Sequence, residues 1–204
     1  MSLSDLSSDL KGMLGSSADK FNQEGRGDLD RLLNTAAAAL SRDKPQNMSA
    51  SLLLVADQAD YDVPALLIKA IYSDWGKKQQ RERQPWQRGF PDRLPSLNIV
   101  KVEAGKRLRL TPPPTALQIA DLGADFVYYY TGRYKIGAKP IDTTVDECDR
   151  DLLLLRATIA AMQDLALSHA STPVSLGPGK FATKTGTPSA VAVTLMTQYE
   201  GMLI

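Results

Sequence analysis

The stretch TTVDECDRDLLLLRATIAAMQDLALSHAS, residues 143–171, predicts one long buried helix against which the rest of the chain packs. Its apolar residues recur at alternating intervals of three and four, which is the spacing of one helical face. Further leucines and alanines widen this face until little of the helix surface is polar. We therefore expect a central helix rather than a peripheral one. The residues of the face are Leu152, Leu155, Ile159, Met162, Ala166 and His169.

The sequence also marks the two ends of this helix. Thr144 is followed three residues later by Glu147, a capping-box pattern that predicts a helix start. Acidic residues beside this pair suit the positive end of the helix dipole, so we expect a solvated acidic start. The helix is expected to stop at residues 171–173. The acids of the start are Asp146, Glu147, Asp149 and Asp151.

Three further helices are predicted by the same periodicity. Residues 2–14 place leucines at helical spacing and end at Gly15. Residues 29–40 form a second helix, for which Asp28 is the expected cap. A last helix is expected to begin at Thr187–Pro188, because threonine is a good cap and proline suits the first turn. The apolar face of the last helix is expected to contain Val191, Leu195, Met196 and Tyr199.

The middle of the chain has the texture of β-structure. Residues 49–55 and 59–63 are short runs around a turn, which predicts a hairpin, and residues 65–72 favour a strand. A second hairpin is expected from residues 97–102 and 107–110, with Gly105 in its turn.

Other parts of this region give weaker local signals. Residues 74–96 combine two tryptophans, three prolines and many charges without apolar periodicity, which predicts an exposed loop. The prolines at 112–114 cannot lie within a regular ladder of strands. Residues 115–122 are expected to form a helical turn that ends at Gly123, and residues 126–130 (FVYYY) a strand.

Together these elements predict a mainly α-helical bundle with an inserted small antiparallel β region, an α+β fold. The expected parts are an N-terminal helix pair at 1–48, an inserted β-hairpin and loop region at 49–141, a central bundle helix at 142–171, and a Gly/Pro-rich loop with a C-terminal helix at 172–204.

Composition limits the classes of protein to consider. A chain of 204 residues can hold one sizeable core, or a core and a small second unit. The formal charge of +1 gives no strong attraction of the whole molecule to nucleic acid or membrane. The single cysteine, Cys148, cannot form an internal disulfide, which suggests a reducing compartment. The N-terminus lacks the pattern of a signal peptide, and the expectation is a soluble intracellular product.

The sequence offers little catalytic chemistry. His169 is the only histidine and ends an apolar stripe, so a packed histidine is favoured over a catalytic base. One histidine and one cysteine make no zinc site, although carboxylates alone could hold Mg²⁺ or Ca²⁺. The run at 177–180 (GPGK) fails as a phosphate loop, because Phe181 stands where a hydroxyl must follow the lysine. We expect no enzyme, and predict no catalytic, cofactor or metal residue.

Residues 77–109 are strongly basic, with ten lysines and arginines against Glu82, Asp92 and Glu103. Interleaved aromatic residues suit three interpretations, namely a solvated loop, a surface for an acidic protein partner, or a grip on nucleic acid. Trp75 and Trp86 equally suit anchoring of the loop to its own sheet. The candidate partner-contact residues are Trp75, Lys77, Lys78, Arg81, Arg83, Trp86, Arg88, Phe90, Lys180 and Tyr199.

The order of several short motifs resembles that of the head-to-tail connector, or adaptor, proteins of tailed bacteriophages. The resemblance covers about residues 3–170. It continues through the expected strand at 126–130 to the long alanine- and leucine-rich helix. The motifs that carry it are SRDKP at 41–45, LLLVADQADYDVP at 52–64, SDWG at 73–76 and LRLTPPP at 108–114.

The resemblance implies a structural virion protein of the neck, assembled in the host cytoplasm. Its partners would be the portal protein, further copies in a ring of twelve that matches the portal, and a downstream neck or tail protein. Genomic DNA would pass through the ring without sequence-specific contact. Contacts in a ring are heterologous, so the acidic region 142–151 and the basic region 77–109 are expected to meet between subunits. The alternative is a DNA-binding module that uses residues 77–109.

Overall fold

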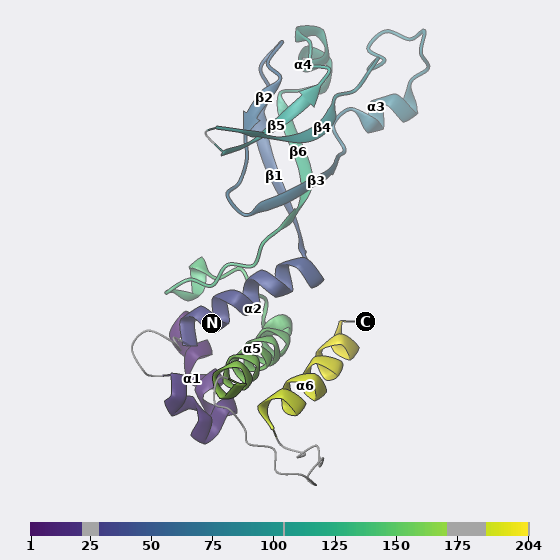
Figure 1. Cartoon of the computed structure of the whole chain (residues 1–204). Helices are drawn as coiled ribbons and strands as arrows, with labels where there is room; N and C mark the ends of the chain where they lie inside the picture. The colour runs from purple at the N-terminus through teal and green to yellow at the C-terminus, as the bar shows by residue number, and fades with distance from the viewer. Residues whose placement is uncertain (22–28, 104, 171–186, 204) are drawn as a thin grey trace. The chain divides into compact units, whose positions relative to one another are not determined.

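The computed structural model describes residues 1–21, 29–103, 105–170 and 187–203 (Figure 1). The chain divides into two compact units, Met1–Pro45 with Tyr134–Ile204, and Gln46–Arg133. We call these the helical unit and the β unit. Each unit has its own cluster of buried apolar side chains. Among the described residues, no helix has the length and apolar character needed to cross a bilayer.

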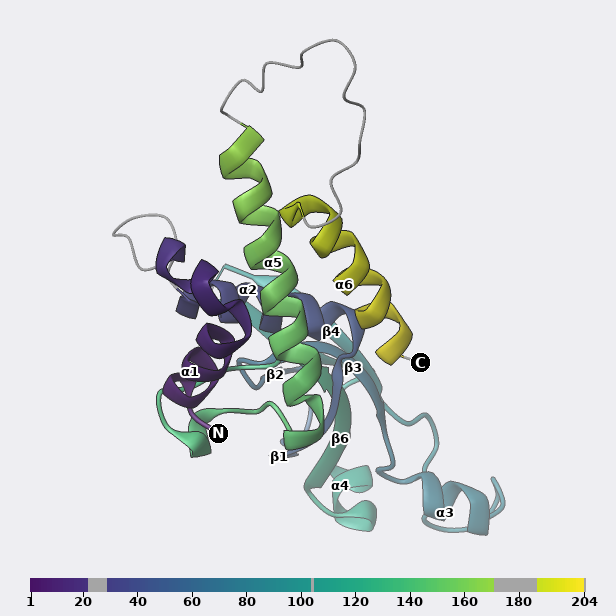
Figure 2. The same ribbon diagram turned by 90° about the horizontal axis from the view of Figure 1, so that it is seen from below.

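Helix α5 is the centre of the helical unit. It packs against α1, α2 and α6 (Figure 2), which confirms the predicted central helix. Leu153, Ala157 and Ile159 of α5 are fully buried. Small side chains on α2, such as Ala36, let the backbones approach closely. The long helices of the unit are α1 Leu3–Leu14, α2 Leu29–Asp43, α5 Arg150–Ala170 and α6 Pro188–Met202.

The start of α6 was predicted with its Thr187 cap, whereas the Ser2 cap of α1 was not predicted. The Ser2 side chain accepts the Asp5 N–H at the start of α1, and the Thr187 side chain accepts the Ala190 N–H at the start of α6. Gly15 caps the end of α1, as expected. Asp28, the expected cap of α2, lies outside the described residues.

The start of α5 was predicted wrongly. The helix begins at Arg150 rather than at the Thr144–Glu147 pair. Thr144 Oγ1 instead accepts the Lys135 N–H at 2.8 Å, so this side chain ties two loops together. Short 3₁₀ turns at Pro140–Asp142 and Glu147–Asp149 fill the intervening chain. This hydrogen bond to Lys135 occupies the Thr144 hydroxyl that a capping box would need.

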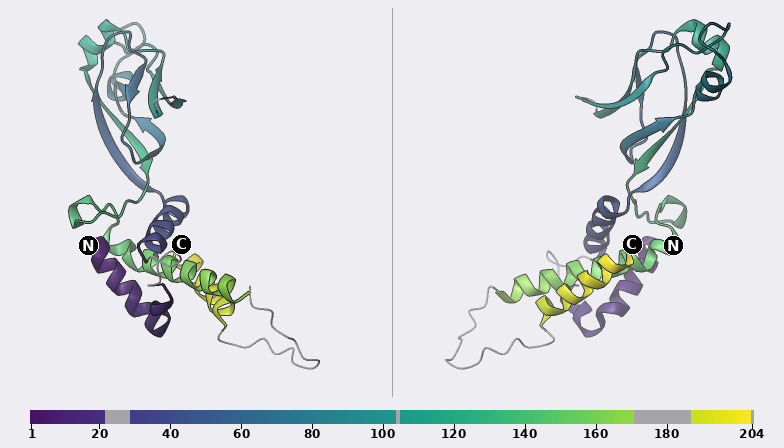
Figure 3. Two further views of the ribbon diagram at one scale, coloured as in Figure 1. Left: turned by 60° about the vertical axis from the view of Figure 1, so that its left-hand side comes forward. Right: turned by 90° about the vertical axis from the view of Figure 1, so that its right-hand side faces the viewer.

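The β unit contains two antiparallel sheets of three strands each, in the orders β1-β6-β3 and β2-β5-β4 (Figure 3). With the helical unit this confirms the predicted α+β fold. The elements are β1 Gln46–Leu53, β2 Asp60–Asp62, β3 Leu67–Ser73, α3 Lys77–Glu82, β4 Ser96–Val102, β5 Gly105–Thr111, α4 Ala116–Leu122 and β6 Asp125–Gly132.

The β4–β5 hairpin and the β6 strand confirm two predictions. Val102 lies opposite Gly105, whose φ of +125° suits glycine at this turn. Strand β6 lies in the middle of its sheet and turns Phe126, Tyr128 and Tyr130 into the core. Strand β3 overlaps the predicted strand at 65–72, and helix α4 forms within the helical turn predicted at 115–122. The Thr115 cap of α4 was not predicted.

The hairpin predicted from residues 49–55 and 59–63 is wrong. Strand β1 pairs with β6, and β2 pairs with β5. The aromatic side chains of β6 provide a broad apolar surface for β1, so Leu52 lies opposite Phe126. Packing between distant segments therefore decides the pairing, and a local turn signal does not reveal it.

The unit boundaries in the structure differ slightly from those expected from sequence. The β unit spans Gln46–Arg133, against the 49–141 insertion drawn from composition. Residues 134–141 therefore belong to the helical unit, where Tyr134 and Ile136 join its apolar cluster.

Candidate functional site

The segment from residue 74 to residue 95 contains most of the predicted contact residues, and we call it the α3 segment. It is not wholly a loop as predicted, because it contains the short helix α3 (Figure 1). Its beginning is fixed by Trp75, which is only 8% exposed. The indole Nε1 donates to the Gly123 carbonyl at 3.0 Å, and the ring packs near Phe126. Trp75 is therefore an anchor to the β unit.

Glycine is required next to this anchor. Gly76 has a φ of +73° and forms the start of α3. A Cβ built there would lie 2.6 Å from Leu94 Cδ2 and 2.9 Å from Leu122 Cδ1. Such distances are far inside van der Waals contact, so any side chain would displace two leucines of the unit. Gly76 lets α3 begin close to the core.

The chain after α3 closes on itself through polar contacts. Arg83 Nη1 donates to the Gly89 carbonyl, and the Gln84 N–H donates to Gln87 Oε1 at 2.8 Å. Phe90, half-buried, follows this closure and lines a cavity of about 390 Å³ beside α4. Arg83 therefore shapes the loop more than it offers charge to a partner.

The basic residues of this segment fall into two groups. Lys77 lies near Asp74 and over the Tyr72 ring, and Lys78 lies 4.0 Å from Glu82. Among the described residues, three exposed arginines of the segment make no ion pair or side-chain hydrogen bond, and the tip residue Trp86 is 81% exposed. We call these the Trp/Arg surface: Arg81, Trp86, Arg88 and Arg93.

Part of the basic charge is neutralised inside the β unit. Arg109 donates two hydrogen bonds to Asp60, at 2.7 and 2.8 Å. This Arg109 hydrogen bond is the main reason why the pKa of Asp60 is lowered. Arg107 pairs with Asp62 at 3.5 Å. Asp60 and Asp62 lie outside residues 77–109, and the β2–β5 pairing that brings them to these arginines was not predicted from sequence.

Two other predicted contact residues fall elsewhere. Tyr199 is fully buried in the helical unit, and its hydroxyl donates to Asp43 Oδ2 at 2.9 Å. Burial, with that hydrogen bond to Asp43, raises the pKa of Tyr199. A side chain so enclosed has no surface to offer a partner. Lys180 lies outside the described residues.

A buried polar cluster in the helical unit was missed by sequence reasoning. The Tyr134 hydroxyl donates to Asp149 Oδ2 at 2.6 Å, and Lys44 Nζ donates to Asp149 Oδ1 at 2.7 Å. The Tyr134 N–H donates to Ser41 Oγ at 2.9 Å. Lys44 and Tyr134 lie at the two points where the chain leaves and re-enters the helical unit. We call these four residues the crossover clamp.

Burial and hydrogen bonds together shift the pKa values of the clamp residues. Desolvation raises the pKa of Asp149, but the hydrogen bonds from Lys44 and Tyr134 outweigh it and leave the pKa lowered. The hydrogen bond to Asp149 raises the pKa of Lys44. Burial, followed by the bond to Asp149, raises the pKa of Tyr134. Asp149 is thus a charged, buried structural acid, not the solvated helix-start residue that was expected.

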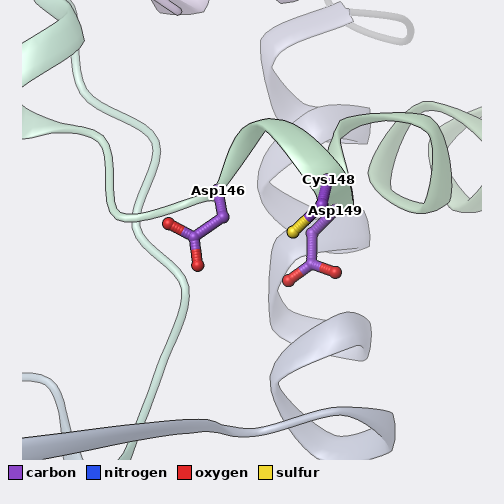
Figure 4. A group of neighbouring side chains, drawn as sticks. All are labelled: Asp146, Cys148 and Asp149. Atoms are coloured by element: carbon purple, nitrogen blue, oxygen red, sulfur yellow. The ribbon is translucent and has the colours of Figure 1, made fainter.

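Asp149 also belongs to a group of possible metal ligands. One ligand atom from each of Asp146, Cys148 and Asp149 lies within 4.8 Å of the others (Figure 4). Both carboxylate oxygens of Asp149 already accept hydrogen bonds from the protein, and the other two side chains are exposed. We therefore assign Asp149 to the clamp. The side chain of His169 lies outside the described residues.

Comparison with known proteins supplies a family. The model of a family described as the SU10 adaptor protein matches residues 1–179. The matched range includes the whole β unit, the α3 segment and the crossover clamp. No curated protein sequence matches the chain.

Proposed function

The chain belongs to the SU10 adaptor protein family, the structural head-to-tail adaptors of tailed bacteriophages, and from that premise we propose that it forms a ring beneath the portal. The ring extends the DNA channel and gives neck or tail proteins a platform to bind. Its place is the virion neck, and its work is assembly rather than catalysis. A ring that matches a twelve-fold portal contains twelve copies.

The Trp/Arg surface is the observation that carries this proposal. Tryptophan and arginine are the residues most enriched at the energetic centres of protein interfaces. Trp86 is 81% exposed, although burial of its large apolar ring is favourable. Within the described residues, no ion pair is formed by the guanidinium groups of Arg81, Arg88 and Arg93. The surface fits an acidic and partly apolar face of the portal or of a neighbouring subunit.

The neighbouring copy offers such an acidic face. Asp142, Asp146, Glu147 and Asp151 are exposed in the helical unit, whereas Asp149 is held in the clamp. We propose that these four exposed acids meet the basic α3 segment of the adjacent subunit. Such a contact joins two different surfaces and can therefore close a ring.

Charge reversal tests the surface directly. The triple variant with Arg81, Arg88 and Arg93 changed to Glu is expected to lose assembly with portal rings. A matched control reverses Lys101, Lys135 and Lys139, which are also exposed, and is expected to assemble normally. Co-sedimentation of each purified full-length chain with portal rings gives the result. Equal co-sedimentation of both variants contradicts the proposed contact.

A second variant tests the contact between subunits. Reversal of Lys77, Lys78, Arg81 and Arg83 is expected to reduce ring formation, which native mass spectrometry or electron microscopy measures. Unchanged rings would show that the acidic and basic regions do not pair across the interface. Because Arg83 closes its loop, the result is compared with a variant that retains Arg83.

The alternative of a DNA-binding module makes a different prediction. Several cations of the basic region are paired with carboxylates of the same unit, including Arg107 and Arg109. With four of the ten cations paired in this way, fewer remain to displace counterions, and we expect weaker binding to duplex DNA than the composition alone suggests. A steep loss of tight binding with rising salt would instead favour the DNA-binding alternative.

A further inference from the structure

Three of the four edge strands in the β unit carry features that discourage pairing with another chain. Strand β2 has only three residues, two of them aspartates. Strand β3 has two register irregularities and exposes Lys69. Strand β4 exposes Lys101. Short length, bulges and charged side chains are the usual protections of sheet edges.

Strand β1 has none of these protections. Its eight residues, QNMSASLL, contain no charge and no proline. Its pairing with β6 is regular from Gln46 opposite Gly132 to Leu53 opposite Asp125. A long, regular and uncharged edge is a template for another strand. Chains with such an edge normally cover it.

The hydrogen-bonding direction of β1 follows from one contact. The Leu54 N–H donates to the Ala124 carbonyl at 2.8 Å, on the β6 side. Backbone direction alternates along a strand, so even-numbered residues face β6. Asn47, Ser49, Ser51 and Leu53 therefore point their N–H and C=O groups away from β6. Among the described residues, no backbone group pairs with this outer edge.

The sequence of the strand is close to a palindrome. Residues 48–52 read Met-Ser-Ala-Ser-Leu, so that large apolar, serine, alanine, serine and large apolar residues follow in either direction. An antiparallel copy of β1 centred on Ala50 would place like residues opposite one another. We propose that the outer edge of β1 binds β1 of a second copy of this chain, related by a two-fold axis through Ala50.

The side chains on both faces fit this pairing. On the inner face, Met48 of one copy lies opposite Leu52 of the other, and the two Ala50 side chains meet. These residues are partly buried against the core of the unit and still half-exposed at the edge. On the outer face, Ser49 lies opposite Ser51, a pair able to exchange hydrogen bonds.

This pairing is distinct from the contact proposed for the ring. A two-fold contact joins the same patch on both copies, whereas a cyclic ring joins two different patches. The β1 pairing therefore belongs to the free chain and covers its exposed edge before assembly. It does not rest on the adaptor function.

The mass of the free protein in solution tests the inference. The full chain is expected to show twice its 22.2 kDa mass by analytical ultracentrifugation. In Ser51→Pro, proline removes an N–H that points away from the sheet, so the strand keeps its pairing with β6. This variant is expected to have half the wild-type mass. Wild-type protein that stays monomeric over the concentration range overturns the inference.

A charge variant guards against misfolding by proline. Ser49→Lys places a charge on the exposed face of β1, and a two-fold pair would bring two such lysines close together. Asn98→Lys makes the same change on exposed β4 and serves as the control. The first is expected to be monomeric and the second dimeric. Equal masses for the two variants, whether both dimeric or both monomeric, contradict pairing through β1.

Cross-linking tests the register itself. In a Cys148→Ser background, Ala50→Cys would place its own thiol opposite the thiol of the partner, in a non-hydrogen-bonded pair with Cα atoms about 4.5 Å apart. Mild oxidation is expected to give a disulfide-linked dimer. Asn98→Cys in the same background is expected to remain uncross-linked. Failure of the Ala50 variant to cross-link, or equal cross-linking of both, overturns the proposed register.

Discussion

Asp149 is the residue through which the two chain crossings of the helical unit are joined. It accepts hydrogen bonds from Lys44 before the β unit and from Tyr134 after it. Its neighbours are 105 and 15 residues away in the chain, so no local motif could have predicted them. The sequence showed an acid near a helix start, and that pattern is usually solvated. In the structure this acid is buried and accepts hydrogen bonds from two distant parts of the chain.

Removal of the carboxylate is expected to destabilise the helical unit. Asp149→Ala leaves the buried Tyr134 hydroxyl without its acceptor, which costs about 1–3 kcal/mol. Asp146→Ala, a change at an exposed neighbour, is expected to stay within about 0.5 kcal/mol of wild type. Urea unfolding of the full chain measures both. Equal unfolding midpoints for the two variants would show that the clamp does not contribute to stability.

The clamp also sets a dependence of stability on pH. The lowered pKa of Asp149 gives stability that is present above about pH 4 and is lost as pH falls through the folded-state value. The raised pKa of Lys44 gives stability that is present below about pH 10 and is lost as pH rises. Asp149→Asn is expected to flatten the acid side of a plot of unfolding free energy against pH. An unchanged acid side would contradict this assignment.

At the scale of elements, local signals predicted well and pairing between distant elements did not. The α1 helix and the β4–β5 hairpin were predicted because their caps, turns and periodicity lie within a few residues. The place of β1 beside β6 was missed because aromatic side chains far along the chain decide it. Because the pairing of β2 with β5 was also missed, the ion pairs of Asp62 with Arg107 and of Asp60 with Arg109 were not predicted. The α3 segment was recognised from its composition. That Trp75 anchors it through a hydrogen bond to the Gly123 carbonyl could be seen only in the structure.

The start of α3 gives a prediction at this scale. Gly76→Ala is expected to destabilise the β unit by about 1–3 kcal/mol, because its backbone has positive φ and two leucine side chains occupy the space of a Cβ. Gly12→Ala in α1 is the matched control, since a Cβ there meets nothing within 4 Å. That control is expected to stabilise the protein by about 0.5–1 kcal/mol. Thermal unfolding of both variants decides, and a neutral Gly76→Ala would refute the packing argument.

The whole molecule exposes two charged surfaces of opposite sign, one on each unit. The helical unit is built around α5 and exposes acids near the start of that helix. The β unit holds the α3 segment on a Trp75 anchor and exposes Trp86 with three arginines. The chain belongs to a phage adaptor family, and in the function proposed above both surfaces contact other proteins of the neck.

A substitution at Trp86 tests the proposed partner contact without disturbing the fold. Because the ring is 81% exposed, Trp86→Ala is expected to leave the free energy of unfolding within about 0.5 kcal/mol of wild type. The same change is expected to weaken binding to its neck partner by about 2 kcal/mol or more, the loss typical of an interface hot spot. Titration calorimetry against portal rings measures the binding. Wild-type affinity in this variant would exclude Trp86 from the contact.

The location of the protein in the virion tests the central claim most directly. Antibodies against the chain are applied to purified phage particles and to tailless heads, and the label is located by electron microscopy. The account predicts label at the neck of complete particles and at a single vertex of tailless heads. Label spread over the capsid, or absent from every particle, would contradict the assignment to a ring beneath the portal.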